Sequence, residues 1–163
     1  MRCWIAFGGN VGDVRAAFAL ALARLTLVGR VGAASSLYDT PPWGPVQQGR
    51  FLNAVVEFET PLAPHALLDL LNAIERESER TRDVRWGPRT LDLDLIAIEG
   101  RSVDTDRLTV PHPRAAERPF VTVPLAEIAP VVMLGSTSAR ELAEEADEVG
   151  MEIAEGPDWA SQG

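Results

Sequence analysis

Blocks of hydrophobic and polar residues predict an alternating order of strands and helices over the first hundred residues. Short apolar runs, each bounded by turn-forming residues, predict four strands, at 2–9, 33–40, 51–59 and 91–98. Apolar positions at helical spacing predict helices over 14–28, with Asp13 as a cap, and over 64–80. The resulting β-α-β-β-α-β order is typical of a ferredoxin-like fold. We therefore expect an α+β protein with an antiparallel sheet covered by helices in three α/β/α layers.

The rest of the chain carries weaker signals. A hairpin is expected through 99–101, followed by an extended piece over 108–114. The segment 120–130 predicts a short helix interrupted by Pro124, and a further helix is expected over 138–148. Because there is no internal repeat or linker, we expect one domain over 1–163, with 141–163 as an acidic segment of unassigned role.

The strand predicted at 91–98, LDLDLIAI, carries two aspartates although Asp is depleted in strands. Alternation along the strand gives two sets of side chains: Asp92, Asp94, Ile96 and Ile98 on one face, and Leu91, Leu93, Leu95 and Ala97 on the other. Two residues of a strand span about 6.5 Å, a spacing that suits carboxylates converging on Mg²⁺. The alternative is a strand whose polar face meets solvent.

Arginines next to this strand favour the metal interpretation. Arg80, Arg82, Arg85 and Arg89 lie just upstream, in or beside an aperiodic segment. A carboxylate pair for metal and a set of guanidinium groups are the two halves of a phosphoryl-transfer site. A salt-bridged surface network remains the alternative.

Composition narrows the possible chemistry further. All fifteen basic residues are arginines, so a Walker-A lysine, a kinase lysine and a Schiff-base lysine are excluded. The net charge of −9 arises mainly from eight acidic residues after position 140. Without those eight residues the charges nearly balance, fifteen basic against sixteen acidic. Since the rest of the chain is not strongly basic, we expect no nucleic-acid partner. The single cysteine, Cys3, fits a reducing compartment, and no membrane span or secretory signal is visible, so we expect a cytoplasmic protein.

Four further residues are candidates for ligand contacts. His112 lies between two prolines, and Trp43 and Trp86 stand in irregular segments where an indole could stack on a flat ring. Asn53 is a polar residue inside the strand FLNAVV and could hydrogen-bond the edge of a heterocycle. For each of them a purely structural role is the alternative.

The order of several motifs resembles one enzyme family. YDTPPWGPVQQGRFLNAVVEFET, WGPRTLDLDLIAI, LTVPHPRAAERPFV and PLAEIAP closely resemble the 6-hydroxymethyl-7,8-dihydropterin pyrophosphokinases of folate biosynthesis, over about residues 3–130. The resemblance implies transfer of the terminal diphosphate of ATP to the hydroxymethyl oxygen of the pterin, with release of AMP. It also implies two Mg²⁺ ions, ATP and 6-hydroxymethyl-7,8-dihydropterin as substrates, and we expect a monomer.

The same resemblance assigns roles to particular positions. Catalytic roles fall on Arg80, Arg82, Asp92 and Asp94, of which the two aspartates are the implied metal ligands. ATP contacts are implied for Glu75, Arg82, Arg85, Trp86, Arg89, Leu95, Arg107, Thr109, His112 and Arg118. Pterin contacts are implied for Thr40, Pro41, Trp43, Phe51, Asn53 and Phe120.

Two of the departures from the family pattern fall at or beside predicted site residues. Phe51 stands where many members have Tyr, which keeps the aromatic ring without its hydroxyl, and Glu79 stands where Gly often precedes the first loop arginine. Two other functions stay open on the sequence: a non-catalytic ligand-binding module, since ferredoxin-like folds serve many purposes, and a two-metal phosphohydrolase.

Overall fold

The computed structural model describes residues 1–78 and 90–161 of the chain. Its main sheet, within these residues, has six strands: β1 (Arg2–Gly9), β2 (Arg30–Ala34), β3 (Leu37–Thr40), β4 (Phe51–Glu59), β5 (Asp92–Ile98) and β10 (Glu152–Glu155). β1 lies between β4 and β5, while β2 and β3 pair with different halves of β4 and β10 pairs with β3. Every one of these pairings is antiparallel, as the sequence predicts.

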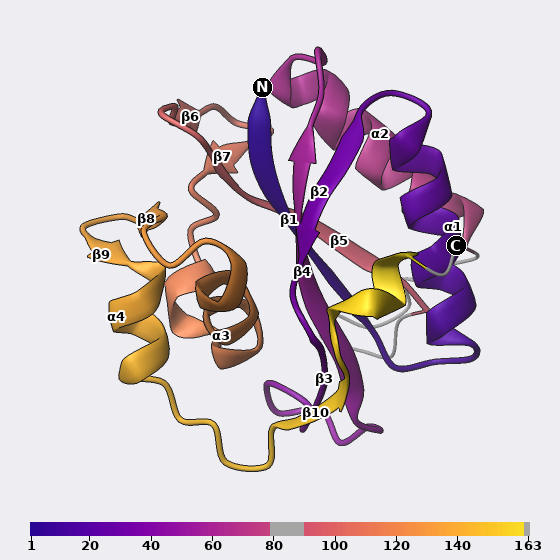
Figure 1. The fold of residues 1–163 in the computed structure, drawn as a ribbon, viewed down its shortest axis with the longest axis vertical. Helices are drawn as coiled ribbons and strands as arrows, with labels where there is room; N and C mark the ends of the chain where they lie inside the picture. Colours follow the sequence, from indigo (N-terminus) through magenta and orange to yellow (C-terminus); the bar gives the residue numbers. More distant parts are fainter. Residues whose placement is uncertain (79–89, 162–163) are drawn as a thin grey trace.

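Helices cover both faces of this sheet (Figure 1). α1 (Val14–Thr26) and α2 (Pro64–Glu77) lie on one face, and α3 (Pro119–Ile128) and α4 (Ala139–Glu144) lie on the other. The shorter elements are β6 (Val103–Asp104), β7 (Thr109–Val110), β8 (Met133–Leu134), β9 (Thr137–Ser138) and 3₁₀ turns over Ala115–Glu117 and Pro157–Ser161. The three-layer α+β prediction is therefore confirmed.

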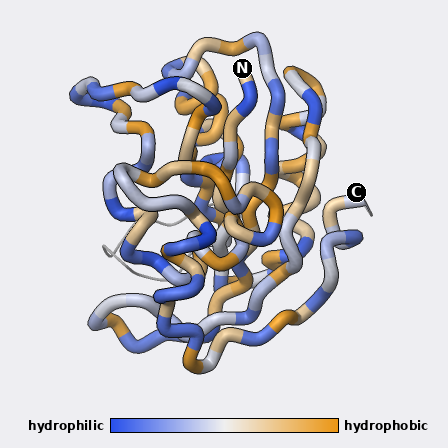
Figure 2. Tube along the Cα trace, turned by 60° about the vertical axis from the view of Figure 1, so that its left-hand side comes forward, coloured by the Kyte–Doolittle hydropathy of each residue, from blue (hydrophilic) through white to orange (hydrophobic). Residues whose placement is uncertain are grey.

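Two hydrophobic cores separate the layers. The larger one, between the sheet and α1 and α2, contains Phe7, Phe18 and Phe58, and the smaller one, under α3 and α4, contains Trp4 and Leu125. In Figure 2, hydrophobic positions gather along the central strands, and hydrophilic positions are frequent in the outer connections. Because strands β1, β4 and β5 are largely buried, their register is fixed.

Local signals place the first helices where the sequence predicts them. The Asp13 carboxylate accepts a hydrogen bond from the backbone N–H of Ala16 at 3.0 Å and so caps α1. Pro64 begins α2, where its missing N–H leaves no helical bond unmade. α3 runs on through Pro124, so the predicted interruption of this helix is wrong.

The single strand predicted at 33–40 is wrong, because two serines divide it into β2 and β3. The Ser35 hydroxyl accepts a hydrogen bond from the backbone N–H of Val55 at 2.9 Å, in place of a strand carbonyl. The backbone N–H of Ser36 turns away to the Glu127 carboxylate, 2.9 Å from Oε1. Side-chain oxygens that accept hydrogen bonds from a strand's backbone N–H groups compete with strand pairing in this way.

The predicted faces of β5 hold as far as Ile96 and then exchange. Ile5 pairs with Leu95 and Trp4 pairs with Ala97, so Ile96 is the extra residue of a β-bulge. Ile96 and Ala97 both enter the smaller core, whereas Ile98 enters the larger one. The prediction was therefore wrong for the last two residues only, and the aspartates keep a common face.

The acidic C-terminal segment is part of the fold. The helix predicted over 138–148 is confined to α4, whose Ser138 and Glu141 form a capping box. Beyond it, β10 extends the sheet and Trp159 packs beside the ring of Phe7, with 6.1 Å between ring centroids. The sequence predicted neither element. Over residues 1–78 and 90–161, no helix combines the length and the hydropathy that crossing a lipid bilayer needs.

Burial of Cys3 leads to a prediction about thiol reactivity. This side chain is inaccessible to solvent, and its burial raises the pKa of the thiol to about 12. Since the thiolate is the reactive form, Ellman's reagent at about pH 8 should leave the native protein unmodified and release one equivalent after denaturation. Rapid modification of the native protein would contradict the structure.

Candidate active site

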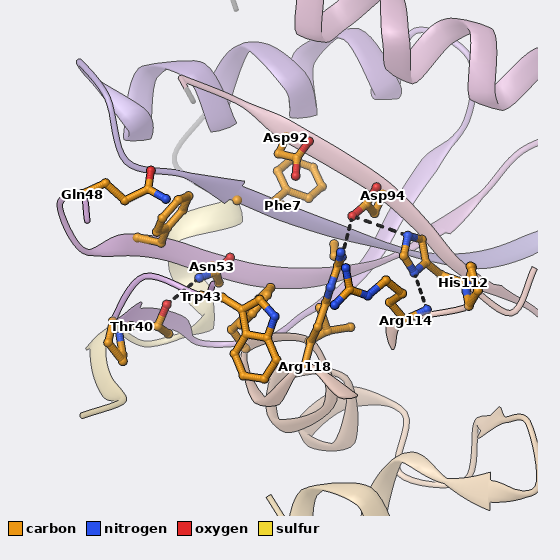
Figure 3. A pocket seen from close by; sticks show the side chains of 17 residues that line it. Phe7, Thr40, Trp43, Gln48, Asn53, Asp92, Asp94, His112, Arg114 and Arg118 are labelled. Atoms are coloured by element: carbon orange, nitrogen blue, oxygen red, sulfur yellow. Dashed lines mark hydrogen bonds and ion pairs between the residues drawn. The ribbon is translucent and has the colours of Figure 1, made fainter. Parts of the chain in front are cut away.

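A cavity of about 370 Å³ opens where β1, β4 and β5 meet the loop after β3 and the start of α3 (Figure 3). The residues that line it and carry polar or aromatic groups are Phe7, Thr40, Trp43, Gln48, Phe51, Asn53, Asp92, Asp94, His112, Arg114, Arg118 and Phe120. Segments far apart in the sequence therefore contribute side chains to one concave surface.

The floor of the cavity is a row of three residues across the sheet. Gly8 of β1 stands opposite Asn53 of β4 on one side and Asp92 of β5 on the other. A Cβ atom on Gly8 would lie 3.0 Å from Asn53 Oδ1 and 4.0 Å from Asp92 Cβ, so the missing side chain leaves the floor open. Ala6, two residues along, stands opposite Asp94 and also lines the cavity.

The two aspartates face the cavity from β5, as alternation predicts. Arg118 Nη1 donates a hydrogen bond to Asp94 Oδ2 at 3.2 Å, and His112 Nε2 lies 3.9 Å from the same oxygen. The Arg118 side chain is only 12% exposed, and its guanidinium carbon stands 5.9 Å from the centre of the Phe120 ring. The cavity therefore holds an anion and a nearly buried cation in contact.

His112 is held by hydrogen bonds on its backbone and its ring. Its backbone N–H donates to the Ile96 carbonyl at 2.8 Å, and its ring Nδ1 accepts from the backbone N–H of Arg114 at 3.2 Å. Burial lowers the pKa of His112, an effect that the Asp94 carboxylate opposes and the Arg118 guanidinium reinforces. The lowered pKa favours the neutral imidazole at pH 7, and with Nδ1 as acceptor its proton is on Nε2, the nitrogen that lies 3.9 Å from Asp94 Oδ2.

The other end of the cavity combines an amide with aromatic rings. The Asn53 amide nitrogen donates to the Thr40 hydroxyl at 2.7 Å, and both side chains are buried. The rings of Trp43 and Phe120 meet edge to face, with centroids 5.8 Å apart and planes at 66°. Such a surface suits a flat heterocycle that carries hydrogen-bonding groups on its edge.

The sequence did not single out several residues that line the cavity. Gly8 could have been found from strand register, because it faces both Asn53 and Asp92. The Gln48 amide oxygen accepts a hydrogen bond from the amide nitrogen of Asn10 at 3.1 Å, which fastens the loop after β3 to the end of β1. Arg114 follows the predicted His112 and lies beside it at the wall, but no sequence signal separated it from other surface arginines.

Four of the predicted nucleotide-site residues lie outside the cavity lining. Leu95 is in the larger core, Thr109 is on β7, and Arg107 forms an ion pair with Asp69 of α2. Glu75 is buried, and its carboxylate accepts the backbone N–H of Leu93 at 2.8 Å, on the outer edge of β5. Their predicted ATP contacts remain predictions.

Another part of the predicted site lies outside the described residues. These residues are Arg80, Arg82, Arg85, Trp86 and Arg89, together with Glu79. The structure describes the two ends that they connect, which are Ser78 after α2 and Thr90 before β5.

The donor set fits a hard divalent cation completed by a substrate. Among residues 1–78 and 90–161, no three or more histidine, cysteine, aspartate or glutamate side chains come together as a metal site. Asp92 and Asp94 instead form a pair of carboxylates that both line the open cavity. Mg²⁺ is commonly bound through one or two carboxylates plus substrate phosphates and water, so these residues fit it.

Comparison with known proteins agrees with this geometry. The sequence model of the family described as 7,8-dihydro-6-hydroxymethylpterin-pyrophosphokinase (HPPK) matches residues 4–130. The chain is 44% identical to the 2-amino-4-hydroxy-6-hydroxymethyldihydropteridine pyrophosphokinase of Methylorubrum extorquens, over 94% of this chain and 99% of that protein. It is also 44% identical to the enzyme of that name from Bacillus subtilis, over 92% and 88% of the two chains.

Solved structures share the fold at low sequence identity. A crystal structure of Plasmodium falciparum HPPK-DHPS superposes with a TM-score of 0.67 at 12% identity, covering 88% of this chain and 44% of that one. The crystal structure of the wild-type form of that protein with SDX-DHP superposes with a TM-score of 0.64 at 14% identity. The chain thus spans less than half of these solved chains, and the likeness supports the fold alone.

The family match does not favour the two alternatives, a non-catalytic binding module and a phosphohydrolase. It covers the strands and loops that form the cavity described above, including both aspartates and Asn53. The chain belongs to the 7,8-dihydro-6-hydroxymethylpterin-pyrophosphokinase family and is a pyrophosphokinase of folate biosynthesis that uses ATP as co-substrate.

Proposed function

We propose that the cavity is where the β,γ-diphosphate of ATP passes to the hydroxymethyl oxygen of 6-hydroxymethyl-7,8-dihydropterin. The observation that carries this proposal is the row of Asn53, Gly8 and Asp92 on one open floor. It sets an amide that can read a heterocycle beside a carboxylate that can hold a metal ion. Acceptor and diphosphate can therefore meet above a single patch of sheet.

The pterin end of the cavity is the part around Thr40, Trp43, Asn53 and Phe120. Asn53 is fixed by its hydrogen bond to Thr40, so its carbonyl oxygen has a defined direction before the pterin arrives. A buried site that holds its polar groups ready rejects rings lacking the matching donors, because those groups would stay unsatisfied. Phe51 and Pro41 complete the lining with apolar surface.

The diphosphate end is the part around Asp92, Asp94, His112 and Arg118. Arg118 presents a guanidinium group, which suits the paired oxygens of a phosphate, and the neutral His112 offers an N–H without adding charge. Mg²⁺ held by Asp92 and Asp94 would neutralise phosphate charge and lower the pKa of the hydroxymethyl group. The predicted loop arginines, Arg80 and Arg82 among them, would add further positive charge.

The reaction is a substitution at the β-phosphorus of ATP. The hydroxymethyl oxygen forms a bond to that phosphorus and releases its proton to water, while the bond from the phosphorus to the oxygen shared with the α-phosphate breaks and AMP leaves with that oxygen and the bonding electrons. Such transfers depend on in-line positioning and on compensation of charge. The fixed orientation of Asn53 and the held guanidinium of Arg118 serve these two requirements.

Product analysis tests the proposed reaction. Incubation of the protein with ATP, Mg²⁺ and the hydroxymethyl dihydropterin should give AMP and the pterin diphosphate in equal amounts by mass spectrometry. Removal of Mg²⁺ with EDTA should stop turnover, and renewed Mg²⁺ should restore it. Inorganic phosphate without pterin diphosphate would contradict the proposal and indicate a hydrolase.

Substitution of each aspartate tests the metal assignment. Asp92→Asn and Asp94→Asn should each lower kcat by about 100-fold or more, because each loses a charged ligand while keeping the shape of the side chain. Asp104→Asn, at an exposed position of β6, is the matched control and should leave kcat unchanged. Near-normal rates in either cavity variant, with the native circular dichroism spectrum, would show that the carboxylates do not hold the metal.

We also propose that the protein acts as a monomer. This proposal is supported by the set of groups that the described residues of one chain bring to the cavity: an amide, two carboxylates and a guanidinium group.

A further inference from the structure

The C-terminal segment, residues 146–161, passes from one face of the sheet to the other. It leaves α4, runs around the edge of the sheet at β3, forms β10 and ends on the side of α1 (Figure 1). Its far end is anchored by Trp159, whose ring packs against Phe18 with 5.8 Å between centroids and whose Nε1 donates to the Ser35 carbonyl at 2.8 Å. An ion pair between Glu155 and Arg15 of α1 adds to this anchor.

The same segment runs beside the strand that ends at the cavity. Glu152 pairs with Asp39 and Ile153 pairs with Tyr38, so β10 covers β3 almost to its last residue, Thr40. Thr40 in turn pairs with Phe51, the first residue of β4. This pair closes the neck of the loop over 41–50, which we call the acceptor loop.

Arg50 joins the C-terminal segment to this neck. Its guanidinium group pairs with the Asp39 carboxylate and donates a hydrogen bond to the Asp39 carbonyl at 3.1 Å. The same group donates to the carbonyl of Gly150. Gly150 has a positive φ of 78°, and a Cβ atom there would lie 3.5 Å from the Pro41 ring. The Arg50 side chain thus links the end of β3, the start of β4 and the C-terminal segment at the entrance to the loop.

The acceptor loop carries cavity residues but little regular structure. Trp43 and Gln48 line the cavity from it, and no residue between 41 and 50 belongs to a helix or strand. When a loop becomes ordered only on ligand binding, its loss of conformational entropy lowers the affinity for the ligand. Contacts that order the neck beforehand reduce this loss.

We propose that Arg50 is a positioning residue for the pterin: it clamps the C-terminal segment onto the neck of the acceptor loop and so holds Thr40 and Trp43 in place. This inference rests on the proposed function, which puts the pterin at these two residues. It gives the acidic C-terminal segment a role in acceptor binding, although its side chains are absent from the cavity lining.

Steady-state kinetics on the full chain tests the role. Arg50→Met should raise the KM for the pterin by about fivefold or more and leave the KM for ATP within about twofold of its normal value, since only acceptor binding loses a prepared loop. Asp39→Asn retains the contacts of Arg50 with the carbonyls of Asp39 and Gly150, so its pterin KM should stay within about twofold of normal. Arg2→Met, which removes ion pairs with Glu59 and Glu99, controls for loss of an exposed arginine and should change neither KM.

The outcomes separate this inference from the function on which it rests. If the unaltered protein forms no pterin diphosphate, the proposed function fails. If it is active but Arg50→Met leaves the pterin KM unchanged, or raises both KM values alike, the positioning role is overturned. An effect of Asp39→Asn as large as that of Arg50→Met would assign the effect to the ion pair alone and overturn the role of the C-terminal segment.

Discussion

The register of β1 against its two neighbours is the constraint on which the rest of the site depends. It places Gly8 between Asn53 and Asp92, and Ala6 beside Asp94. A slip of one residue would send these side chains to the opposite face of the sheet, into the core under α1 and α2. Burial on both faces opposes such a slip, because Ile5 and Phe7 would leave the core that they fill. The same packing that stabilises the fold therefore fixes the distance between the amide and the carboxylates.

β5 satisfies this constraint although it is an edge strand of the sheet. Edge strands expose unpaired backbone groups, which proteins usually cover. Here the Glu75 carboxylate accepts the N–H of Leu93, and the backbone N–H of His112 donates to the carbonyl of Ile96, each at 2.8 Å. The second contact also carries His112 to the wall of the cavity. The hydrogen bond between His112 and Ile96 thus both protects the edge and positions a residue of the site.

The sequence predicted the parts of the fold that depend on local pattern. Strands β1 and β4, the starts of the first two helices and the common face of Asp92 and Asp94 follow from periodicity, from the Asp13 cap and from Pro64. The bulge at Ile96 depends on pairing with β1 and leaves no mark in the alternation.

Other features depend on contacts between distant residues. The break at Ser35 requires the N–H of Val55, and the position of Trp159 requires the rings of Phe7 and Phe18. In the site, the resemblance implied pterin contacts for Asn53, Trp43 and Phe120, and these three residues line one cavity. Gly8 was not predicted as a site residue, because it shapes the cavity floor by having no side chain.

Pterin affinity after closing the floor tests the central claim most directly. Titration calorimetry in the presence of an unreactive ATP analogue would compare the unaltered protein, Gly8→Val and the control Ala33→Val, at an exposed position of β2 away from the cavity. Gly8→Val should lose measurable pterin binding while keeping a cooperative unfolding transition, and Ala33→Val should bind normally. A folded Gly8→Val protein that binds the pterin as tightly as the unaltered chain would contradict the account.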